Sequence, residues 1–388
     1  MPSSSLFGRR IHIAGSIDKT AAIASLEEVN NARNFVTILV KELMRKGATF
    51  VVPVDAENLR AEDGAPLCFD WLIWQAIMDN ILFRPAGAPL PVAVAVQHHK
   101  TEEQIPTQFH ELWDNFKSSD FARIENAAHW NMGSKRMEAQ ARWGDILITI
   151  GGSEGVLSLA NLYHETGRPV VPLNIPVCAS GTGSRRLFEM GQTSAYTQRL
   201  FKTIPPMDAH GWINRINFAG RMPISERVPI LLDLLENLQR PKAFAVRLLN
   251  PDHADFIDVD NFFENVVKPV VEDELGFELV TIDGERAFES ASVVQDIFTN
   301  LHKSSIVIAD ITGLRPNCFI ELGYGLGRSI PTMLTAKSGV SHPFDVAVFS
   351  GHHWETAVKA DERKENFRKH WNAIKNRSSL VPLEPLIP

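Results

Sequence analysis

Short apolar runs alternate along the chain with longer stretches in which apolar residues recur at helical spacing. The first run, residues 10–15, ends at a glycine, and a helical pattern over residues 21–46 follows it. A second apolar run, residues 48–55, comes directly after the glycine that ends this helix. A strand, a helix and another strand in this order form the unit from which parallel sheets are built. The pattern therefore predicts a parallel α/β fold from the start of the chain.

The same alternation continues to about residue 180. Residues 180–186 are rich in glycine, serine and arginine, which predicts a mobile, basic loop. The chain then becomes mostly helical, most clearly over residues 227–238. Further strands are predicted at residues 91–96, 146–150 and 169–173, and helices at residues 68–82, 102–121, 124–143 and 156–166.

A second α/β unit is predicted after a short linker at residues 240–242. Its strands are expected from residue 243 and at residues 277–282, 305–309, 330–334 and 344–350, and its helices at residues 259–274, 292–303, from residue 317 and after residue 359. A length of 388 residues suits two domains. We therefore predict an α/β fold with two domains, residues 1–240 and 241–388, each a mainly parallel sheet flanked by helices.

Composition narrows the classes of partner. The net charge is −7 and no basic block is present, so bulk nucleic acid is not expected as a partner. The three cysteines have no metal-ligand spacing and the histidines lack a third ligand, so no metal site is expected. No apolar run reaches membrane-spanning length, and we expect a cytoplasmic protein without a membrane partner.

A glycine-rich turn joins the strand at residues 146–150 to the next helix. Backbone N–H groups at a helix N-terminus favour a phosphate, and glycines let it approach closely. The turn is neither the Rossmann GxGxxG nor the GK[ST] of a P-loop, and a plain tight turn explains its spacing equally well. The residues of this turn that are predicted to bind a nucleotide are Gly151, Gly152, Ser153, Glu154 and Gly155.

The early glycine–serine turn, the GGSEG turn and the PVVPL strand together resemble the SLOG superfamily over most of residues 8–180. This superfamily includes lysine-decarboxylase-like cytokinin-activating enzymes and nucleotide-sensing domains of bacterial antiviral systems, and it implies a Rossmann-like fold. Its usual late motif is PGGxGTxxE. Here Ile150 stands at the first position, Val156 replaces the threonine and Leu159 replaces the catalytic glutamate. The resemblance therefore implies a domain that binds a nucleotide without cleaving it. It also implies that Gly15, Ser16 and Arg185 contact that nucleotide.

A second motif lies at residues 305–327, where a buried strand, a loop and a glycine-rich helix follow one another. Asp310 ends the strand, Pro316 suits the first position of the helix, and Asn317 suits a helix cap. Asn317 and Glu321 are four residues apart and share a helix face. Open α/β sheets bind ligands at the carboxyl ends of their strands, so this stretch is a predicted ligand site.

Each acidic residue of this motif has an ordinary structural explanation. Glu321 early in a helix favours the helix dipole, and Asp310 could merely cap a loop. Together they suit the cleavage of an N-glycosidic bond, in which Glu321 attacks the anomeric carbon or stabilises its positive charge. Asp310 and Asn317 would hold the sugar hydroxyls. Gly323 and Gly327 are expected to let a neighbouring element pack closely against the helix.

This stretch also resembles the nucleoside 2-deoxyribosyltransferase-like and TIR-like nucleotide-cleaving domains of bacterial defence effectors, over about residues 242–350. Those domains typically contain ADLTGxNPNVFYELGYAHALGK, and the PFD at residues 343–345 matches a later motif. The resemblance implies a flavodoxin-like fold with Glu321 as the catalytic carboxylate, and it implies that Thr312, Gly313, Gly323 and Asp345 contact the substrate. The matching residues are Asp310, Thr312, Gly313, Pro316, Asn317, Glu321, Leu322, Gly323 and Gly327.

The two resemblances together imply a bacterial anti-phage effector. The first domain would sense a small nucleotide, the second would cleave the N-glycosidic bond of NAD or a nucleotide, and the protein would act as a homo-oligomer. NAD or the nucleotide is then the substrate, and no cofactor is expected. The motif shows no clear general acid, which favours NAD because nicotinamide leaves without one. The alternatives are a salvage nucleoside 2-deoxyribosyltransferase or nucleotide hydrolase, and a non-catalytic nucleotide sensor.

Overall fold

The chain forms two compact units, one up to Gln239 and one from Arg240 onward. A computed structural model describes residues 4–97, 102–126, 132–218, 222–282, 293–340 and 351–375. None of the described helices combines the length and apolar character that crossing a membrane requires. Each unit has its own sheet and its own buried core.

The first unit contains a six-stranded parallel sheet in the order β4-β3-β2-β1-β5-β6. Strands β2 to β4 extend from one side of β1, whereas β5 and β6 extend from the other. The strand order therefore reverses at β1 and β5, as in a Rossmann-like sheet. The strands are β1 (Arg10–Ser16), β2 (Thr49–Pro53), β3 (Ala93–Gln97), β4 (Ala122–Asn126), β5 (Ile146–Gly151) and β6 (Val170–Leu173).

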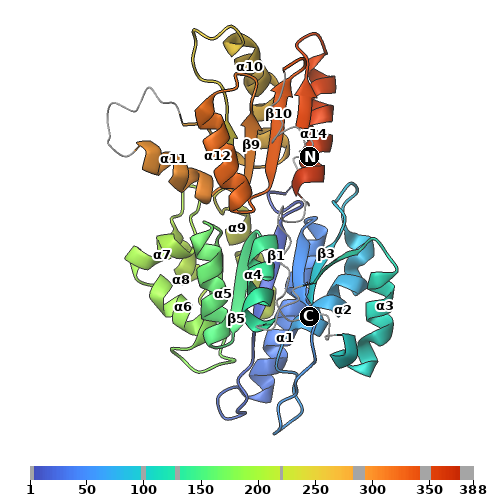
Figure 1. Cartoon of the computed structure of the whole chain (residues 1–388). Coiled ribbons are helices and arrows are strands. Elements are labelled where there is room, and N and C mark those ends of the chain that lie inside the picture. The colour runs from blue at the N-terminus through green and yellow to red at the C-terminus, as the bar shows by residue number, and fades with distance from the viewer. Residues whose placement is uncertain are drawn as a thin grey trace. The chain divides into compact units, whose positions relative to one another are not determined.

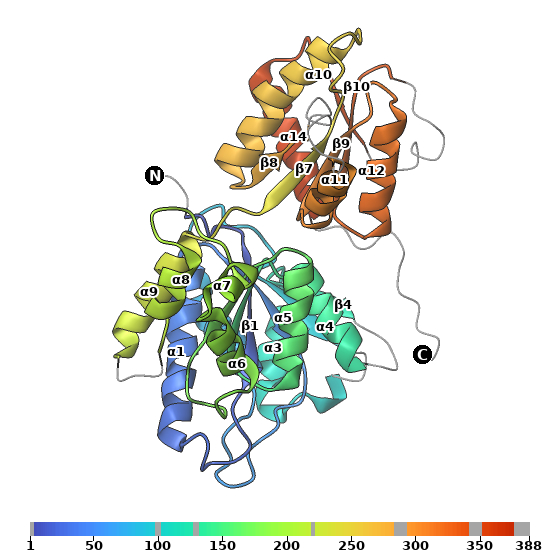
Figure 2. The ribbon, with the colours of Figure 1, turned by 90° about the vertical axis from the view of Figure 1, so that its left-hand side faces the viewer.

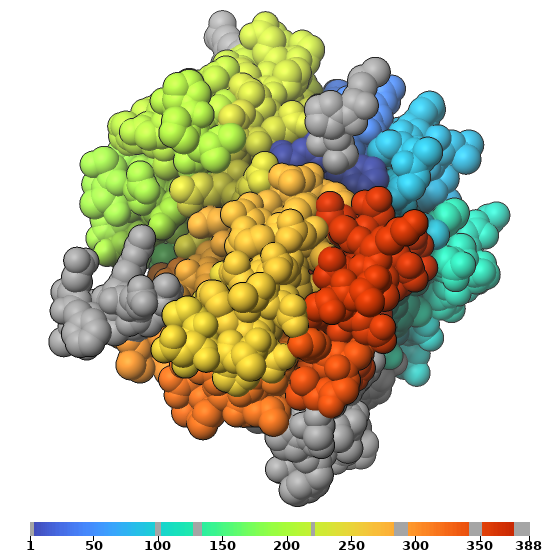
Figure 3. Space-filling view, turned by 90° about the horizontal axis from the view of Figure 1, so that it is seen from above, coloured from blue at the N-terminus to red at the C-terminus, as the bar shows by residue number. Residues whose placement is uncertain are grey.

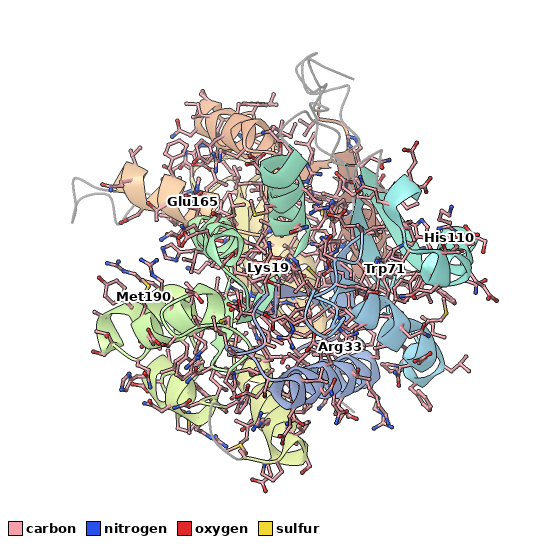
Figure 4. All side chains as sticks on the ribbon, turned by 90° about the horizontal axis from the view of Figure 1, so that it is seen from below. Lys19, Arg33, Trp71, His110, Glu165 and Met190 are labelled. Carbon is pink, nitrogen blue, oxygen red and sulfur yellow. The ribbon has the colours of Figure 1, made fainter. Side chains whose placement is uncertain are left out.

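Helices cover both faces of this sheet (Figures 1 and 2). The main core lies under α1, α2, α3 and α9, and smaller apolar clusters lie under α4 and α5 on the opposite face. Helices α1 and α2 lie side by side, as Figure 4 shows around the labelled Arg33 and Trp71. The helices are α1 (Leu26–Arg45), α2 (Asp70–Asn80), α3 (His110–Lys117), α4 (Met132–Trp143), α5 (Glu154–Glu165), α6 (Gly183–Gly191), α7 (Ser194–Leu200), α8 (Ala209–Arg215) and α9 (Ile224–Glu236).

Local sequence explains the start of α1. The side chain of Ser25 accepts a hydrogen bond from the backbone of Glu28, and the Glu28 carboxylate accepts one from the backbone of Ser25. This reciprocal capping box satisfies two backbone donors that the helix itself leaves unpaired. The helix then buries an apolar stripe, which includes Val29, Val36 and Leu43, against the sheet.

The second unit contains a five-stranded parallel sheet in the order β11-β10-β9-β7-β8. Counted from the start of this unit the order is 5-4-3-1-2, which is the flavodoxin-like arrangement. The order reverses between β7 and β9, so their carboxyl ends define the crevice where such sheets bind ligands. The strands are β7 (Lys242–Val246), β8 (Glu278–Val280), β9 (Ile306–Asp310), β10 (Thr332–Lys337) and β11 (Gly351–Trp354).

Two apolar clusters lie on opposite faces of this second sheet. Side chains of β9 alternate between them, because Ile306 and Ile308 belong to one and Val307 and Ala309 to the other. The first cluster lies under α10 (Phe256–Phe262), its π-helical continuations Phe263–Val267 and Pro269–Glu274, and α14 (Ala360–Lys375). Figure 3 shows α10 with its continuations, in gold, beside α14, in red. The second cluster lies under α11 (Val293–His302) and α12 (Pro316–Gly327).

The predicted fold class, two α/β domains with mainly parallel sheets, is confirmed. Three local predictions were wrong. Residues 124–143 begin as strand β4, because alternating residues there pair with β3 at the sheet edge. Only His110–Lys117 of the helix predicted at residues 102–121 is α-helical. The loop predicted at residues 180–186 already contains the start of α6 at Gly183. The strand predicted at residues 344–350 lies outside the described residues.

Candidate functional site

In the first unit, the carboxyl ends of β1 and β5 meet at the point where the strand order reverses. Ser16 pairs with Gly151, and the backbone N–H of Gly152 donates to the carbonyl oxygen of Ser16 at 2.7 Å. The two strands approach so closely that a Cβ added at Gly15 would lie 1.8 Å from the carbonyl oxygen of Ile150. The early and the late glycine turns of the sequence therefore form one structure at the expected ligand crevice.

The N-termini of two helices converge on this glycine turn. A Cβ added at Gly183 would lie 2.2 Å from the carbonyl oxygen of Gly152, so the first turn of α6 packs directly on the turn that starts α5. Neither Ser153 nor Thr182, the N-cap residues of α5 and α6, caps its helix with a side-chain hydrogen bond. Two uncapped helix N-termini present backbone N–H groups and positive dipole ends, which suit an anionic ligand such as a phosphate.

The predicted nucleotide-binding residues around this turn differ in accessibility. Around Gly155, a Cβ would meet no described atom within 4 Å. The Arg185 guanidinium, in contrast, donates to the side chain of Asn174 at 3.1 Å and to the carbonyl oxygen of Cys178 at 3.0 Å. These two bonds hold the guanidinium against the protein, and nucleotide binding by Arg185 stays a prediction. The neighbouring Arg186 is half-exposed and lies 4.0 Å from the carboxylate of Glu154.

The positions that carry catalysis in the SLOG motif are apolar and buried. Val156 and Leu159 belong to the apolar cluster around Tyr163 on the outer face of β5. A side chain at position 159 therefore packs against the sheet and supplies no acid. Positions 156 and 159 therefore offer no carboxylate for cleavage at the turn.

Acidic side chains gather at the neighbouring carboxyl end of β2. Asp55 forms an ion pair with Arg136 of α4, and Asp70 opens α2 close by. Burial raises the pKa of Asp70 to about 7, with Arg136 lowering it and Asp55 raising it further. Negative charge on this side leaves the glycine turn and the α6 N-terminus as the better place for phosphate groups.

In the second unit, Asp310 lies inside the protein and its carboxylate is fully engaged. The residue is 1% exposed. Its Oδ2 accepts hydrogen bonds from the Thr335 hydroxyl at 2.8 Å and the Trp354 indole at 2.9 Å, and its Oδ1 accepts one from the backbone of Thr312 at 3.1 Å. Burial raises the pKa of Asp310, and these hydrogen bonds oppose the rise.

Strand alternation places Asp310 and Glu321 on opposite faces of the sheet. Trp354, the partner of Asp310, belongs to the cluster under α10 and α14, whereas Leu322 of α12 belongs to the other cluster. We had expected Asp310 to hold sugar hydroxyls beside Glu321. In the structure, the hydrogen bonds of its carboxylate instead hold the carboxyl ends of β9, β10 and β11 together.

The two residues after the strand also hold the local backbone. Thr312 is buried, and its hydroxyl accepts a hydrogen bond from the backbone N–H of Lys337 at 2.9 Å. Gly313 packs on Leu248, whose Cδ1 would lie 3.1 Å from a Cβ added at the glycine. Both residues therefore position the loop that leads to α12, and Thr312 is too buried to be an open substrate contact.

Glu321 has the properties expected of a reactive carboxylate. It is half-buried in the second turn of α12, the helix that follows β9 and the loop at its carboxyl end. Burial raises its pKa to about 6, with Arg315 lowering it. Among the residues that the structure describes, its carboxylate makes no hydrogen bond or ion pair. A partly buried carboxylate with unused acceptor capacity at a ligand crevice is a candidate catalytic group.

Other predictions about α12 are only partly met. The helix begins at Pro316 with Arg315 as its N-cap, so Asn317 lies inside the first turn and is not the cap. Asn317 is exposed and shares the flank of Glu321, as its spacing predicts. Close packing occurs at Gly325, where a Cβ would lie 3.2 Å from the Thr332 hydroxyl oxygen, and not at Gly323, where it would meet no described atom within 4 Å.

A Cβ added at Gly327, which is exposed, would likewise meet no described atom within 4 Å. The predicted substrate contact Asp345 lies outside the described residues.

Sequence reasoning missed Thr335 and Trp354, the partners of Asp310. Their signal is positional, since both lie at or near the carboxyl ends of strands: Thr335 in β10, next to β9, and Trp354 in β11, next to β10. Within the described ranges, no group of three or more His, Cys, Asp and Glu side chains is placed to hold a metal ion.

The fold defines a class: a two-unit α/β protein in which the strand order of each parallel sheet reverses, the place where such sheets bind ligands. Residues 6–235 match the model of the family described as "ATP nucleosidase Cap17-like, N-terminal". The match spans more than half of the chain, so the chain belongs to this family of nucleosidase-like proteins of antiviral defence. No curated protein sequence matches the chain.

Two solved structures show distant likeness. One concerns DNA processing protein A from Helicobacter pylori, at 15% identity over 54% of this chain and 80% of that one, with a TM-score of 0.32. The other concerns a fungal multi-domain GH3 β-N-acetylglucosaminidase, at 11% identity over 93% of this chain and 49% of that one, with a TM-score of 0.22. At TM-scores this low, neither likeness bears on the fold or the function.

Proposed function

We propose that this chain is an N-glycosidase of anti-phage defence that hydrolyses the bond between base and ribose in a nucleotide. The carrying observation is Glu321, a half-buried carboxylate with a pKa of about 6 and no described hydrogen-bond partner. Above that pKa the carboxylate is mainly ionised, and it can attack the anomeric carbon or stabilise the positive charge that develops there. Water then supplies the oxygen that replaces the base.

ATP is the first substrate that we propose, because the matched family is described by ATP nucleosidase activity. Hydrolysis breaks the bond between N9 of adenine and C1′ of ribose, and the products are adenine and ribose 5′-triphosphate. The leaving adenine takes a proton, whereas nicotinamide leaves NAD without one. No acid on the described flank of α12 is assigned to that proton transfer, and this keeps NAD as the second candidate.

For the first unit we propose a regulatory role. The glycine turn and the N-termini of α5 and α6 would bind the phosphates of a nucleotide signal, and the apolar residues at positions 156 and 159 would leave it uncleaved. We further propose that the protein acts as a homo-oligomer and that occupancy of this site controls the second unit. Sedimentation with and without nucleotide would test the change of assembly.

A substrate panel tests the proposed activity. The full chain is incubated with ATP, dATP and NAD, alone and with linear or cyclic nucleotides as added signals, and released base is followed by chromatography. We expect free adenine from ATP. Nicotinamide release alone would assign NAD, and cleavage of dATP in preference to ATP would favour the salvage enzyme. No base release under any condition would remove the enzyme proposal and leave a nucleotide sensor.

A further inference from the structure

Two non-glycine residues of the described chain have a backbone in the left-handed region: Leu314, with φ of 48°, and Ser329, with φ of 55°. Ser329 follows the end of α12, where a left-handed residue is common. The backbone N–H of Ile330 donates to the carbonyl oxygen of Gly325 at 3.0 Å, which is a bond that this kind of helix ending makes. The conformation of Ser329 therefore follows from the helix terminus, whereas that of Leu314 has no such cause.

The surroundings of Leu314 impose its conformation. Its backbone N–H donates to the carbonyl oxygen of Ile311 at 3.0 Å, which closes a tight turn. Thr312 at the start of this turn is tied to Asp310 on one side and to Lys337 on the other. On the far side, Arg315 is extended before Pro316, as a residue that precedes proline prefers. The chain has little freedom to relax between these fixed points.

A leucine at positive φ raises the conformational free energy of the backbone, whereas glycine or asparagine adopts this conformation with less strain. Its side chain is 44% exposed, so burial in the core does not offset the strain. Strained residues that the surrounding structure over-determines cluster at functional sites. Leu314 lies in the loop between β9 and α12, directly ahead of the helix that carries Glu321. This loop follows the carboxyl end of a strand, which is the edge where open α/β sheets bind ligands.

We propose that Leu314 is a specificity-determining residue that packs against the planar face of the substrate's base. This inference rests on the proposed N-glycosidase function and adds the part of the substrate that the loop recognises. An aliphatic side chain offers contact area without hydrogen bonds, which suits a flat, uncharged nucleobase and not a phosphate or a sugar. The hydrogen bonds of Asp310 then serve recognition of the base, because they hold the turn that carries Leu314.

The test compares variants of the two left-handed residues in the full chain. Leu314→Asn keeps a residue that tolerates this backbone but removes the apolar contact, and Ser329→Gly is the matched control. We expect Leu314→Asn to raise KM for ATP about tenfold with kcat nearly unchanged, as loss of uniform binding predicts. The thermal midpoint should stay level or rise by about 2–4 °C. Ser329→Gly should leave both kinetic constants unchanged.

Inhibition by ribose 5-phosphate, which lacks a base, distinguishes the loss of a contact between Leu314 and the base from a displacement of the whole turn. Its inhibition constant should be the same for wild type and Leu314→Asn. An unchanged KM for ATP in that variant would overturn the inference while leaving the enzyme proposal intact. Equal weakening of ATP and ribose 5-phosphate would also overturn it, because the turn would then have moved as a whole. A wild type that releases no base from any nucleotide would overturn both proposals together.

Discussion

Glu321 is both ionisable and partly buried, and burial disfavours the charged form of its carboxylate. Its half-buried position raises its pKa to about 6 from an ordinary value of 4.5, so the folded state binds the proton more tightly than the unfolded state does. The group favours folding below its unfolded pKa and loses that advantage as pH rises through its folded pKa. At neutral pH the charged side chain therefore lowers stability, which is a common cost of a functional residue.

Glu321→Gln should consequently be more stable than the wild type at pH 8 and should lose most of this advantage at pH 4.5. The expected gain at pH 8 is about 1 kcal/mol, because water reaches part of the carboxylate and screens it. Urea unfolding of the full chain at the two pH values measures it. Glu278→Gln, at an exposed position of β8, serves as the control for the loss of a surface carboxylate. Equal effects of both substitutions would mean that Glu321 has an ordinary environment.

At the same scale, the sequence predicts the position of Glu321 on its helix better than the surroundings of Asp310. The spacing from Asn317 to Glu321 depends only on helix geometry, and the structure reproduces it. The direction of the Asp310 side chain depends on the register of β9 in the sheet and on Trp354, 44 residues later in the chain. Nothing local in the sequence fixes that contact. Thr312 was misjudged for the same reason, since its hydroxyl partner, Lys337, lies in another strand.

At the scale of elements, the glycine turn and α6 form the central contact of the first unit. Two glycines of this segment have positive φ, 74° at Gly181 and 47° at Gly183, but they differ in their surroundings. A Cβ at Gly181 would meet no described atom within 4 Å, whereas one at Gly183 would collide with the carbonyl oxygens of Gly151 and Gly152. The position of the α6 N-terminus therefore depends on glycine at position 183.

Gly183→Ala should displace α6 and weaken nucleotide binding to the first unit by at least about tenfold, because the helix N-terminus would move away from the phosphate position. Gly181→Ala should cost only the backbone penalty of about 1 kcal/mol and leave binding intact. Calorimetric titration of each variant with ATP, alongside thermal unfolding, distinguishes the two effects. Identical binding losses in both variants would contradict this account of the site.

The sequence predicted helices and strands correctly where the apolar pattern was strong, and it failed at the sheet-edge strand β4 and at the start of α6. The buried strands at residues 146–150 and 305–309 were found because apolar runs ending in Gly or Asp are distinctive. Strand β4 was missed because its five residues alternate weakly and, among the described strands, β3 alone pairs with it. The start of α6 was missed because its glycines and arginines look like a loop until the turn at Gly151 and Gly152 packs on them.

At the scale of the whole molecule, each unit buries a separate core. The described apolar clusters fall entirely within one unit or the other, and none combines residues from both. The sequence could predict this division from the repeated α/β alternation on either side of residues 240–242. The sequence also predicts that the second unit carries the chemistry, because Leu159 stands where the first motif has its catalytic glutamate. The structure adds that Leu159 is buried and that Glu321 is half-buried with a raised pKa.

A fragment of residues 1–239 should therefore fold by itself and bind a nucleotide without releasing its base. Independent cores make cooperative unfolding of the isolated fragment the expected behaviour. Thermal unfolding followed by circular dichroism, and calorimetric titration with ATP and cyclic nucleotides, measure these two properties. A folded fragment that binds none of them would remove the regulatory role of the first unit, and base release by the fragment would move catalysis there.

The central claim is that Glu321 performs the cleavage, and the rate of base release measures it most directly. Wild type, Glu321→Gln and the control Glu278→Gln are compared as full chains with ATP, and free adenine is quantified by chromatography over time. The account predicts steady adenine release by the wild type and by Glu278→Gln, and a loss of at least about a hundredfold in Glu321→Gln while the variant stays folded. Undiminished release by Glu321→Gln would contradict it.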